Sequence, residues 1–122
     1  MTPKKGATLP LGRSGEEIAL AYLQKKKFRV VERGFRFHRG EIDLIAWDRE
    51  TLVFVEVKTR AGQSFGRPEE SVTPAKQNQI RKLALAYLST RRLDGINCRF
   101  DVVAVRVSGN GPPQIDHFPD AF

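Results

Sequence analysis

The sequence has little or nothing of several features that usually identify a function. Its 122 residues include one cysteine, Cys98, so no disulfide can form within the chain. A chain with so little cysteine is typical of a reducing compartment, and we expect a cytoplasmic protein. No apolar run approaches the ~18 residues of a membrane span. The basic first residues lack an apolar core, so we expect no secretory signal.

Three catalytic or binding patterns are also missing from the sequence. It shows no zinc-ligand spacing of Cys and His, no Gly-rich phosphate loop and no Ser-His-Asp set. What it does have is positive charge, because 21 Lys and Arg against 14 Asp and Glu give a net charge of +7. Such an excess favours a polyanionic partner, and we expect nucleic acid, DNA more than RNA, and no membrane.

The pattern of apolar residues predicts a single domain over residues 13–108. Residues 1–12 are expected to form a flexible basic arm, and residues 109–122 a turn with a possible edge strand at 114–118. Ser14 and Glu17 fit a capping box for a first helix that ends near Lys27. Thr73 and Pro74 suit the start of a second helix that ends near Thr90. Strands are expected at residues 28–37, 41–47, 52–59 and 99–107.

This order, α-β-β-β-α-β, predicts an α/β fold with a mixed sheet flanked by helices. The first three strands have short links and are expected to be antiparallel, whereas the last follows a helix and can return parallel to the third. Residues 61–72 lack periodicity and are expected to form a loop. By alternation, one face of the second and third strands is apolar. That face comprises Ile42, Leu44, Ala46, Val53, Val55 and Val57.

The second and third strands carry the most informative pattern, in the segment GEIDLIAWDRETLVFVEVKTR. With the turn at Arg49-Glu50, paired residues have numbers that sum to 99, so Asp43 lies opposite Glu56. Like charges facing each other are destabilising. The two carboxylates are therefore expected to hold Mg²⁺ or Mn²⁺, with the backbone carbonyl of Val57 as a further ligand.

Lys58 and Glu16 are the next candidates for this site. Lys58 faces the same pocket, where it would orient or deprotonate a water or neutralise a phosphate. Glu16 shares a helix face with apolar residues and is expected to supply a third carboxylate. Two alternatives stay open. Lys58 can simply bridge Glu56 and Glu41 in a surface ion-pair ladder, and Glu16 can simply favour the helix N-terminus.

Several basic and polar residues are expected to contact nucleic acid. Lys76 and Gln77 lie one turn ahead of the buried stripe of the second helix and are expected to overhang the same pocket, with a solvated first turn as the alternative. The expected phosphate contacts, which would be salt-sensitive and independent of sequence, are Arg36, Arg39, Arg60 and Arg67. Asp101 begins an apolar strand, and we expect it to act as a hydrogen-bond partner at the strand end.

The motifs together resemble a known superfamily. Asp43, Glu56 and Lys58, after a helix bearing Glu16, resemble the PD-(D/E)xK nucleases, with Ile42 in place of the proline. The resemblance is closer to the YraN-like family of uncharacterised bacterial proteins. It rests on GEEIALAYL, GEIDLIA, FVEVKTR, the start of the second helix and RFDVV, and it covers about residues 12–107.

The resemblance implies a restriction-endonuclease-like fold and a core like that of archaeal Holliday-junction resolvases. It implies that Glu16, Asp43 and Glu56 bind metal and that Lys58 is the catalytic lysine. The expected function is a divalent-metal-dependent endonuclease acting on DNA, including branched DNA, for which a homodimer would supply two active sites. The alternative is a non-catalytic module that binds DNA or RNA.

Overall fold

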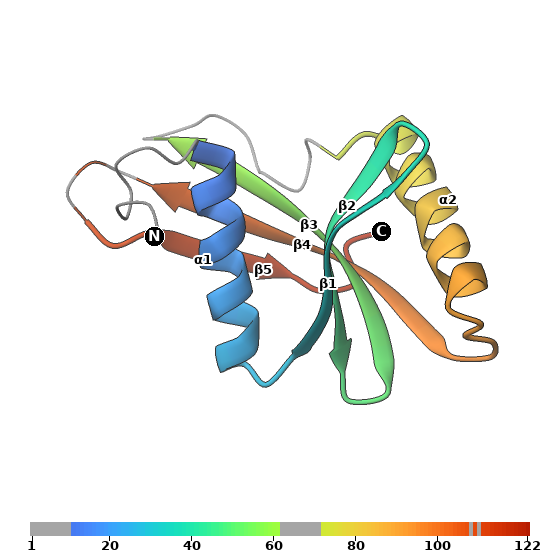
Figure 1. The fold of residues 1–122 in the computed structure, drawn as a ribbon. Helices are drawn as coiled ribbons and strands as arrows, with labels where there is room; N and C mark the ends of the chain where they lie inside the picture. The colour runs from blue at the N-terminus through green and yellow to red at the C-terminus, as the bar shows by residue number, and fades with distance from the viewer. Residues whose placement is uncertain (1–10, 62–71, 108, 110) are drawn as a thin grey trace, which may run out of the picture.

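The structure is a computed structural model that describes residues 11–61, 72–107, 109 and 111–122. It contains two helices and five strands in these residues (Figure 1). In chain order they are α1 (Leu11–Lys25), β1 (Arg29–Phe37), β2 (Gly40–Asp48), β3 (Thr51–Ala61), α2 (Pro74–Thr90), β4 (Asn97–Val107) and β5 (Gln114–Phe118). No helix in this part of the chain is long and apolar enough to cross a membrane.

The strands form one mixed sheet in the order β1-β2-β3-β4-β5. β3 and β4 are parallel, as the intervening helix requires, and the other neighbours are antiparallel. α1 lies on one side of the twisted sheet and α2 on the other (Figure 1). The predicted α/β class and mixed sheet are confirmed, the architecture is consistent with the restriction-endonuclease-like fold, and the possible edge strand is present as β5.

Two short turns set the register of the first three strands. His38 and Arg49 both have positive φ, 56° and 59°, the left-handed conformation that two-residue hairpin turns require. The predicted register is confirmed near the second turn, where pairs from Asp48↔Thr51 to Leu44↔Val55 all sum to 99. The apolar side chains of β2 and β3 are therefore correctly divided between the two faces over this length.

Each helix buries one face against the sheet. α1 contributes Ala19 and Leu23 to a cluster with Leu44, Val53 and Val55. α2 packs on the opposite face through the stripe that its sequence predicted, and the buried side chains are Ile80, Leu83, Ala84 and Tyr87. The sheet is therefore covered on both faces, which leaves the strand ends and the hairpin turns as places where polar groups gather.

The predicted face of Ile42 is wrong. Ile42 packs with Ile45 in the α2-side cluster, whereas Leu44 packs on the α1 side. The β1–β2 pairing runs from Arg33↔Leu44 to Phe35↔Ile42 and passes over Gly34, whose φ is 64°. Strict alternation therefore fails at Asp43, between the two apolar residues, because a left-handed glycine opposite it re-aims the strands.

The predicted start of the first helix is also wrong. α1 begins at Leu11, so Ser14 lies inside the helix and does not cap it, and residues 11 and 12 are helical rather than part of an arm. Pro10 was the signal, because proline favours the start of a helix. The helix ends at Lys25, slightly before the predicted Lys27, whose φ of 75° cannot continue it. Residues 1–10 and most of the predicted loop 61–72 lie outside the described residues.

The start of α2 matches its prediction. Thr73 has an extended backbone, and its hydroxyl accepts a hydrogen bond from the Lys76 N–H at 3.2 Å. Pro74 occupies the first helical turn, where its missing N–H has no consequence. This cap fixes the point at which the chain enters α2, and it thereby sets where the first-turn side chains lie.

Candidate metal and phosphate site

Asp43 and Glu56 lie where β2 and β3 separate. The last regular pair of the two strands is Leu44↔Val55, and Asp43 and Glu56 are the next residue on each strand. The Asp43 carboxylate continues the connection, because its Oδ2 accepts a hydrogen bond from the Val57 N–H at 2.8 Å. A side chain thus replaces a backbone acceptor at the point where the ladder ends.

The Val57 carbonyl points to the same side of β3 as the Val57 N–H. In an antiparallel ladder the N–H and C=O of one residue face the same neighbouring strand. Because this N–H reaches Asp43 on β2, the carbonyl is directed to the β2 side, beyond the last regular pair. The backbone oxygen that the sequence nominated as a ligand is therefore aimed toward the two carboxylates.

Burial and repulsion act together on Asp43. Burial, followed by the negative charge of Glu56, raises the pKa of Asp43 to about 7, against the opposing effect of the Val57 N–H. Glu56 itself is buried, with 6% of its surface exposed. The ionised form of Asp43 is therefore disfavoured both by its lack of contact with water and by the nearby charge of Glu56. A divalent cation would remove this conflict by compensating both charges.

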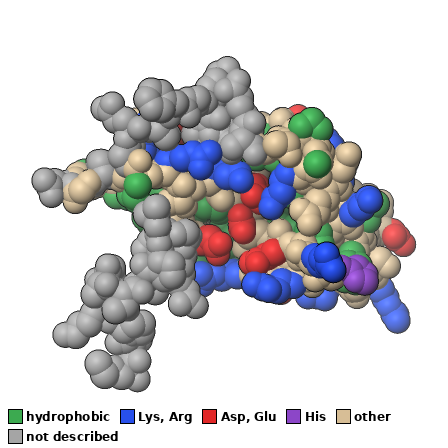
Figure 2. All heavy atoms as spheres, turned by 90° about the horizontal axis from the view of Figure 1, so that it is seen from above, with side chains coloured by type: hydrophobic (Ala, Val, Ile, Leu, Met, Phe, Trp, Pro, Cys, Tyr) green, Lys and Arg blue, Asp and Glu red, His purple; other side chains and the backbone are tan. Residues whose placement is uncertain are grey.

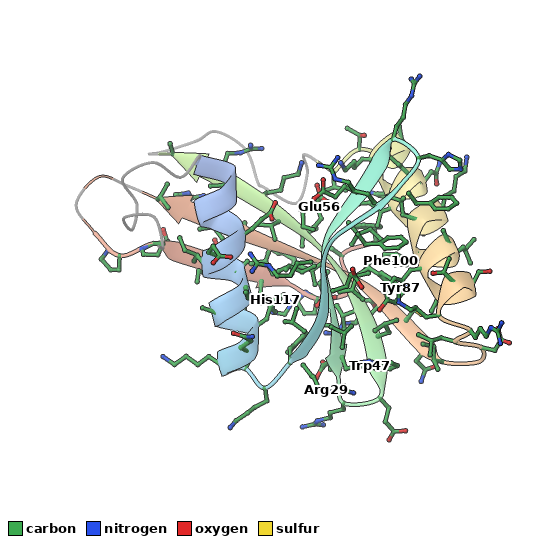
Figure 3. All side chains as sticks on the ribbon, viewed as in Figure 1. Arg29, Trp47, Glu56, Tyr87, Phe100 and His117 are labelled. Carbon is green, nitrogen blue, oxygen red and sulfur yellow. The ribbon has the colours of Figure 1, made fainter. Side chains whose placement is uncertain are left out.

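Two lysines converge on Glu56. Lys58 Nζ lies 3.5 Å from Glu56 Oε2, and Lys76 Nζ from the first turn of α2 lies 3.7 Å from the same oxygen. Figure 3 shows Glu56 on β3 close to the β1–β2 hairpin. The structure thus places Lys76 over the pocket, as its sequence position suggested. It gives no Lys58–Glu41 ion pair of the predicted ladder in the residues described, since Glu41 contacts Arg36 at 3.2 Å.

Glu16 stands near this site without joining a compact ligand set. Burial, then the charge of Glu41, raises the pKa of Glu16, and Glu56 contributes a smaller effect. Its neighbour Glu17 forms an ion pair with Arg33 of β1. In the described part of the chain no three His, Cys, Asp or Glu side chains are placed to hold one ion. The predicted triad of Glu16, Asp43 and Glu56 is therefore not assembled here.

Glu41 is the acidic residue whose role the sequence interpretation underestimated. Its charge raises the pKa of both Asp43 and Glu16. Its Oε2 lies 3.1 Å from where a Cβ on Gly34 would stand, so the glycine leaves room for the carboxylate. The sequence signal was its position two residues before Asp43 on the same strand. The acidic cluster, meaning Glu16, Glu41, Asp43 and Glu56, therefore gathers four carboxyl groups whose charges act on one another, although no three of them are placed to hold one ion.

Basic side chains surround this cluster. Figure 2 shows Asp and Glu side chains gathered in the middle of one face, with Lys and Arg side chains on both sides. Arg36 is largely exposed, and Arg60 lies on β3 opposite Arg106 of β4. Gln77 has a structural contact, since its amide donates to the Val72 carbonyl at 3.0 Å. The predicted contact Arg67 lies outside the described residues.

A second polar network lies away from Glu56. Asp101 is fully buried and accepts hydrogen bonds from Arg99 at 2.9 and 3.0 Å and from the Asp120 N–H at 3.0 Å. His117 Nε2 lies 2.7 Å from Oδ2 of the same carboxylate. Burial raises the pKa of Asp101, but the bonds from His117 and Arg99 outweigh it and hold the pKa below its ordinary value. This network ties β5 and the C-terminal residues to β4.

The predicted hydrogen-bonding role of Asp101 is confirmed, but its predicted place at a strand end is wrong, because β4 begins at Asn97 and Asp101 lies within it. Nothing in the sequence pointed to its partner His117. Figure 3 shows His117 on the α1 side of the sheet. A cleft of about 900 Å³ lies beside it, near the β2–β3 turn. Its lining mixes basic residues such as Lys26 and Arg49 with acidic residues such as Glu50 and Asp116. The cleft therefore lacks the one-signed charge of the surroundings expected for a polyanion site.

Comparison with known proteins identifies relatives over nearly the whole chain. Residues 15–105 match the family described as Uncharacterised protein family UPF0102. A UPF0102 protein from Geobacter sulfurreducens is 46% identical over 112 residues, which are 92% of this chain and 88% of that protein. A UPF0102 protein from Geotalea uraniireducens is 50% identical, again over 92% of this chain and 88% of that protein. A UPF0102 protein from Syntrophotalea carbinolica is 48% identical over 93% of this chain and 92% of that protein.

Proposed function

The chain belongs to the uncharacterised protein family UPF0102, the YraN-like family that its motifs indicated, and we propose that it is a divalent-metal-dependent endonuclease. The proposed reaction is hydrolysis of a phosphodiester in DNA, including branched DNA. The observation that carries the proposal is the end of the β2–β3 ladder, where Asp43 and Glu56 follow the last pair and two lysines reach Glu56.

The donor set fits Mg²⁺ or Mn²⁺. Asp43 and Glu56 offer hard carboxylate oxygens, and the Val57 carbonyl offers a neutral one on the same side of β3. Mg²⁺ commonly uses only one or two carboxylates and keeps several waters, so a third protein carboxylate in contact is not required. When bound, the metal would supply Lewis-acid stabilisation of the negative charge that develops on the phosphate. The charges of Glu16 and Glu41 add to the attraction for a cation.

Lys58 and Lys76 have distinct tasks in this proposal. Glu56 holds both ammonium groups, at 3.5 and 3.7 Å, so each is oriented before substrate arrives. Lys58 comes from the same strand as Glu56 and is assigned to the attacking water, which its ammonium group orients. Lys76 comes from α2 and is assigned to a phosphate oxygen of the substrate, where its positive charge offsets the negative charge of the phosphate.

The substrate class follows from charge. The net charge of +7 persists although four acidic residues are concentrated at the site. The excess is therefore carried elsewhere, and basic residues flank the acidic cluster (Figure 2). The phosphate backbone of a nucleic acid would be attracted to these flanking basic residues, while its scissile phosphate would bind at the metal site. Two symmetric cuts in a four-way junction would require two such sites, so a homodimer belongs to the proposal for that substrate.

The test measures cleavage of linear duplex, flapped duplex, four-way junction and single-stranded RNA with Mg²⁺, Mn²⁺ or EDTA. We expect metal-dependent cleavage of at least one DNA substrate by the wild type. Asp43→Asn, Glu56→Gln and Lys58→Ala should each lower the rate by about 100-fold or more, the scale of losing a charge-stabilising or proton-transferring group. No cleavage by the wild type, or equal rates for these variants, would refute the nuclease.

Neighbouring residues supply matched controls. Glu16→Gln should lower cleavage through weaker metal affinity, because the charge of Glu16 acts on Asp43. Glu17→Gln should not, because Glu17 is paired with Arg33. Lys25→Ala, at the far end of α1, removes the same charge as Lys58→Ala without touching Glu56. Salt-sensitive binding that survives EDTA, without hydrolysis of any substrate, would instead support the non-catalytic binding module.

A further inference from the structure

A groove of about 520 Å³ lies between the β1–β2 turn and α2. Figure 1 shows this turn beside α2. The residues that line the groove are Phe37, His38, Arg39, Gly40, Gln79, Lys82 and Leu83. The groove is distinct from the carboxylate pair but shares β2 with it, since Gly40 begins the strand that carries Asp43.

Tight packing fixes the floor of the groove. A Cβ on Gly40 would lie 2.7 Å from Leu83 Cδ1 and 3.1 Å from Gln79 Nε2, so the turn backbone lies directly on α2. His38 adopts the left-handed backbone that the two-residue turn requires. The groove is therefore a formed feature between two packed elements, and its side chains project from a fixed backbone.

The chemistry of the lining is aromatic and cationic. Phe37 is 42% exposed, which is unusual for a large apolar side chain. Its ring packs edge to face against the His38 ring, with the two ring centroids 4.3 Å apart. Arg39 and Lys82 supply positive charge, and none of the residues given for this lining is a carboxylate. An exposed ring beside cations is the combination that holds an unpaired nucleotide, because the base stacks while the phosphate is neutralised.

We propose that this groove binds one unpaired base of a nucleic acid, stacked on Phe37, with the adjoining phosphate facing Arg39 and Lys82. The inference rests on the proposed nuclease function and narrows its substrate to nucleic acid with single-stranded character, such as a flap or an opened junction arm. Asp43 lies three residues after Gly40 on β2, a distance on the order of 10 Å at about 3.3 Å for each step. That span is a few nucleotides of a stacked strand at about 3.4 Å each.

The test measures binding in EDTA, so that no cleavage is needed. Fluorescence anisotropy gives Kd for a single-stranded oligonucleotide, a flapped duplex and a blunt duplex, each containing 2-aminopurine as a stacking reporter. We expect Phe37→Ala to weaken binding of the first two by about 5- to 150-fold, to leave the blunt duplex unchanged, and to abolish the stacking quench. Phe37→Trp should retain both. Leu85→Ala is the matched control, because Leu85 is an exposed apolar residue of α2 outside the groove lining.

Unchanged affinity of Phe37→Ala for the single-stranded and flapped substrates, or an equal loss on all three substrates, would overturn the inference. Arg39→Ala with Lys82→Ala provides a second route should Phe37→Ala fail to fold. That pair should weaken single-strand binding and flatten its salt dependence, and an unchanged salt dependence would count against the groove. Fluorescence quenching that depends on Phe37, without cleavage of any substrate, would support base binding in the groove and refute the nuclease function. Cleavage and binding that are both unaffected by Phe37→Ala would support the nuclease function and refute base binding in the groove.

Discussion

Neutralising Asp43 is expected to make the metal-free protein more stable. The folded-state pKa of about 7 lies above the ordinary 3.8. The folded protein therefore holds this proton more tightly than the unfolded chain does. Stability contributed at this position is greatest below pH 4, falls as the pH rises toward 7, and is constant above that. At about 1.36 kcal/mol per pH unit, the complete effect is about 4 kcal/mol.

The variant Asp43→Asn removes this titration and keeps an oxygen that accepts the Val57 N–H. We expect its free energy of unfolding to exceed that of the wild type by about 4 kcal/mol at pH 8. At pH 5 the difference in free energy of unfolding should be smaller by about 3 kcal/mol, because wild-type Asp43 is then mostly protonated in the folded state. Titrating groups that do not interact with Asp43 affect both proteins equally.

Urea unfolding in EDTA at the two pH values measures these gaps. Trp47, the single tryptophan, packs against the α2-side cluster and reports unfolding by fluorescence. Asp94→Asn is the control, since Asp94 is an exposed acid in the link before β4, and we expect a change below about 0.5 kcal/mol. A gap between Asp43→Asn and wild type that is independent of pH, or a less stable variant at pH 8, would refute the account of this site.

Three further outcomes are expected. Mg²⁺ at about 100 times its Kd should stabilise the wild type by about 2.7 kcal/mol in thermal or urea unfolding, and Asp43→Asn should lose most of that gain. Gly15→Ala should destabilise by about 1–3 kcal/mol, because the added methyl would clash with Thr59 Oγ1 where α1 crosses β3; no loss would contradict this close approach. Asp101→Asn should cost about 3–5 kcal/mol in urea unfolding by leaving Arg99 without its buried charge partner, and a loss below about 1 kcal/mol would show that the network is not an ion pair.

The elements that the sequence predicted well are those specified by adjacent residues. Thr73 and Pro74 mark the start of α2 because a cap is a contact within one turn of chain. The Arg49-Glu50 turn set the β2–β3 register because a hairpin of known turn length has only one pairing. The register does not extend to the predicted pair of Asp43 and Glu56, because the ladder ends at Leu44↔Val55 and these two residues follow it.

The predictions that failed depended on contacts between distant parts of the chain. The face of Ile42 was wrong because Gly34, on another strand, bends the hairpin at Asp43. Glu16 was assigned from helix periodicity alone, which gives a direction but no distance to β3.

Local signals in the sequence specify the order of the elements, the pairing of β2 with β3, and two carboxylates and a lysine close to the end of that pairing. Periodicity and turn chemistry act over a few residues, so they can be read without the fold. Only the tertiary structure showed that Lys76 reaches Glu56, that Glu41 joins the acidic cluster, and that Gly40 rests on Leu83 to form the groove. These arrangements depend on how α2 packs against the β1–β2 hairpin, and that packing is decided by the fit of side chains far apart in the chain.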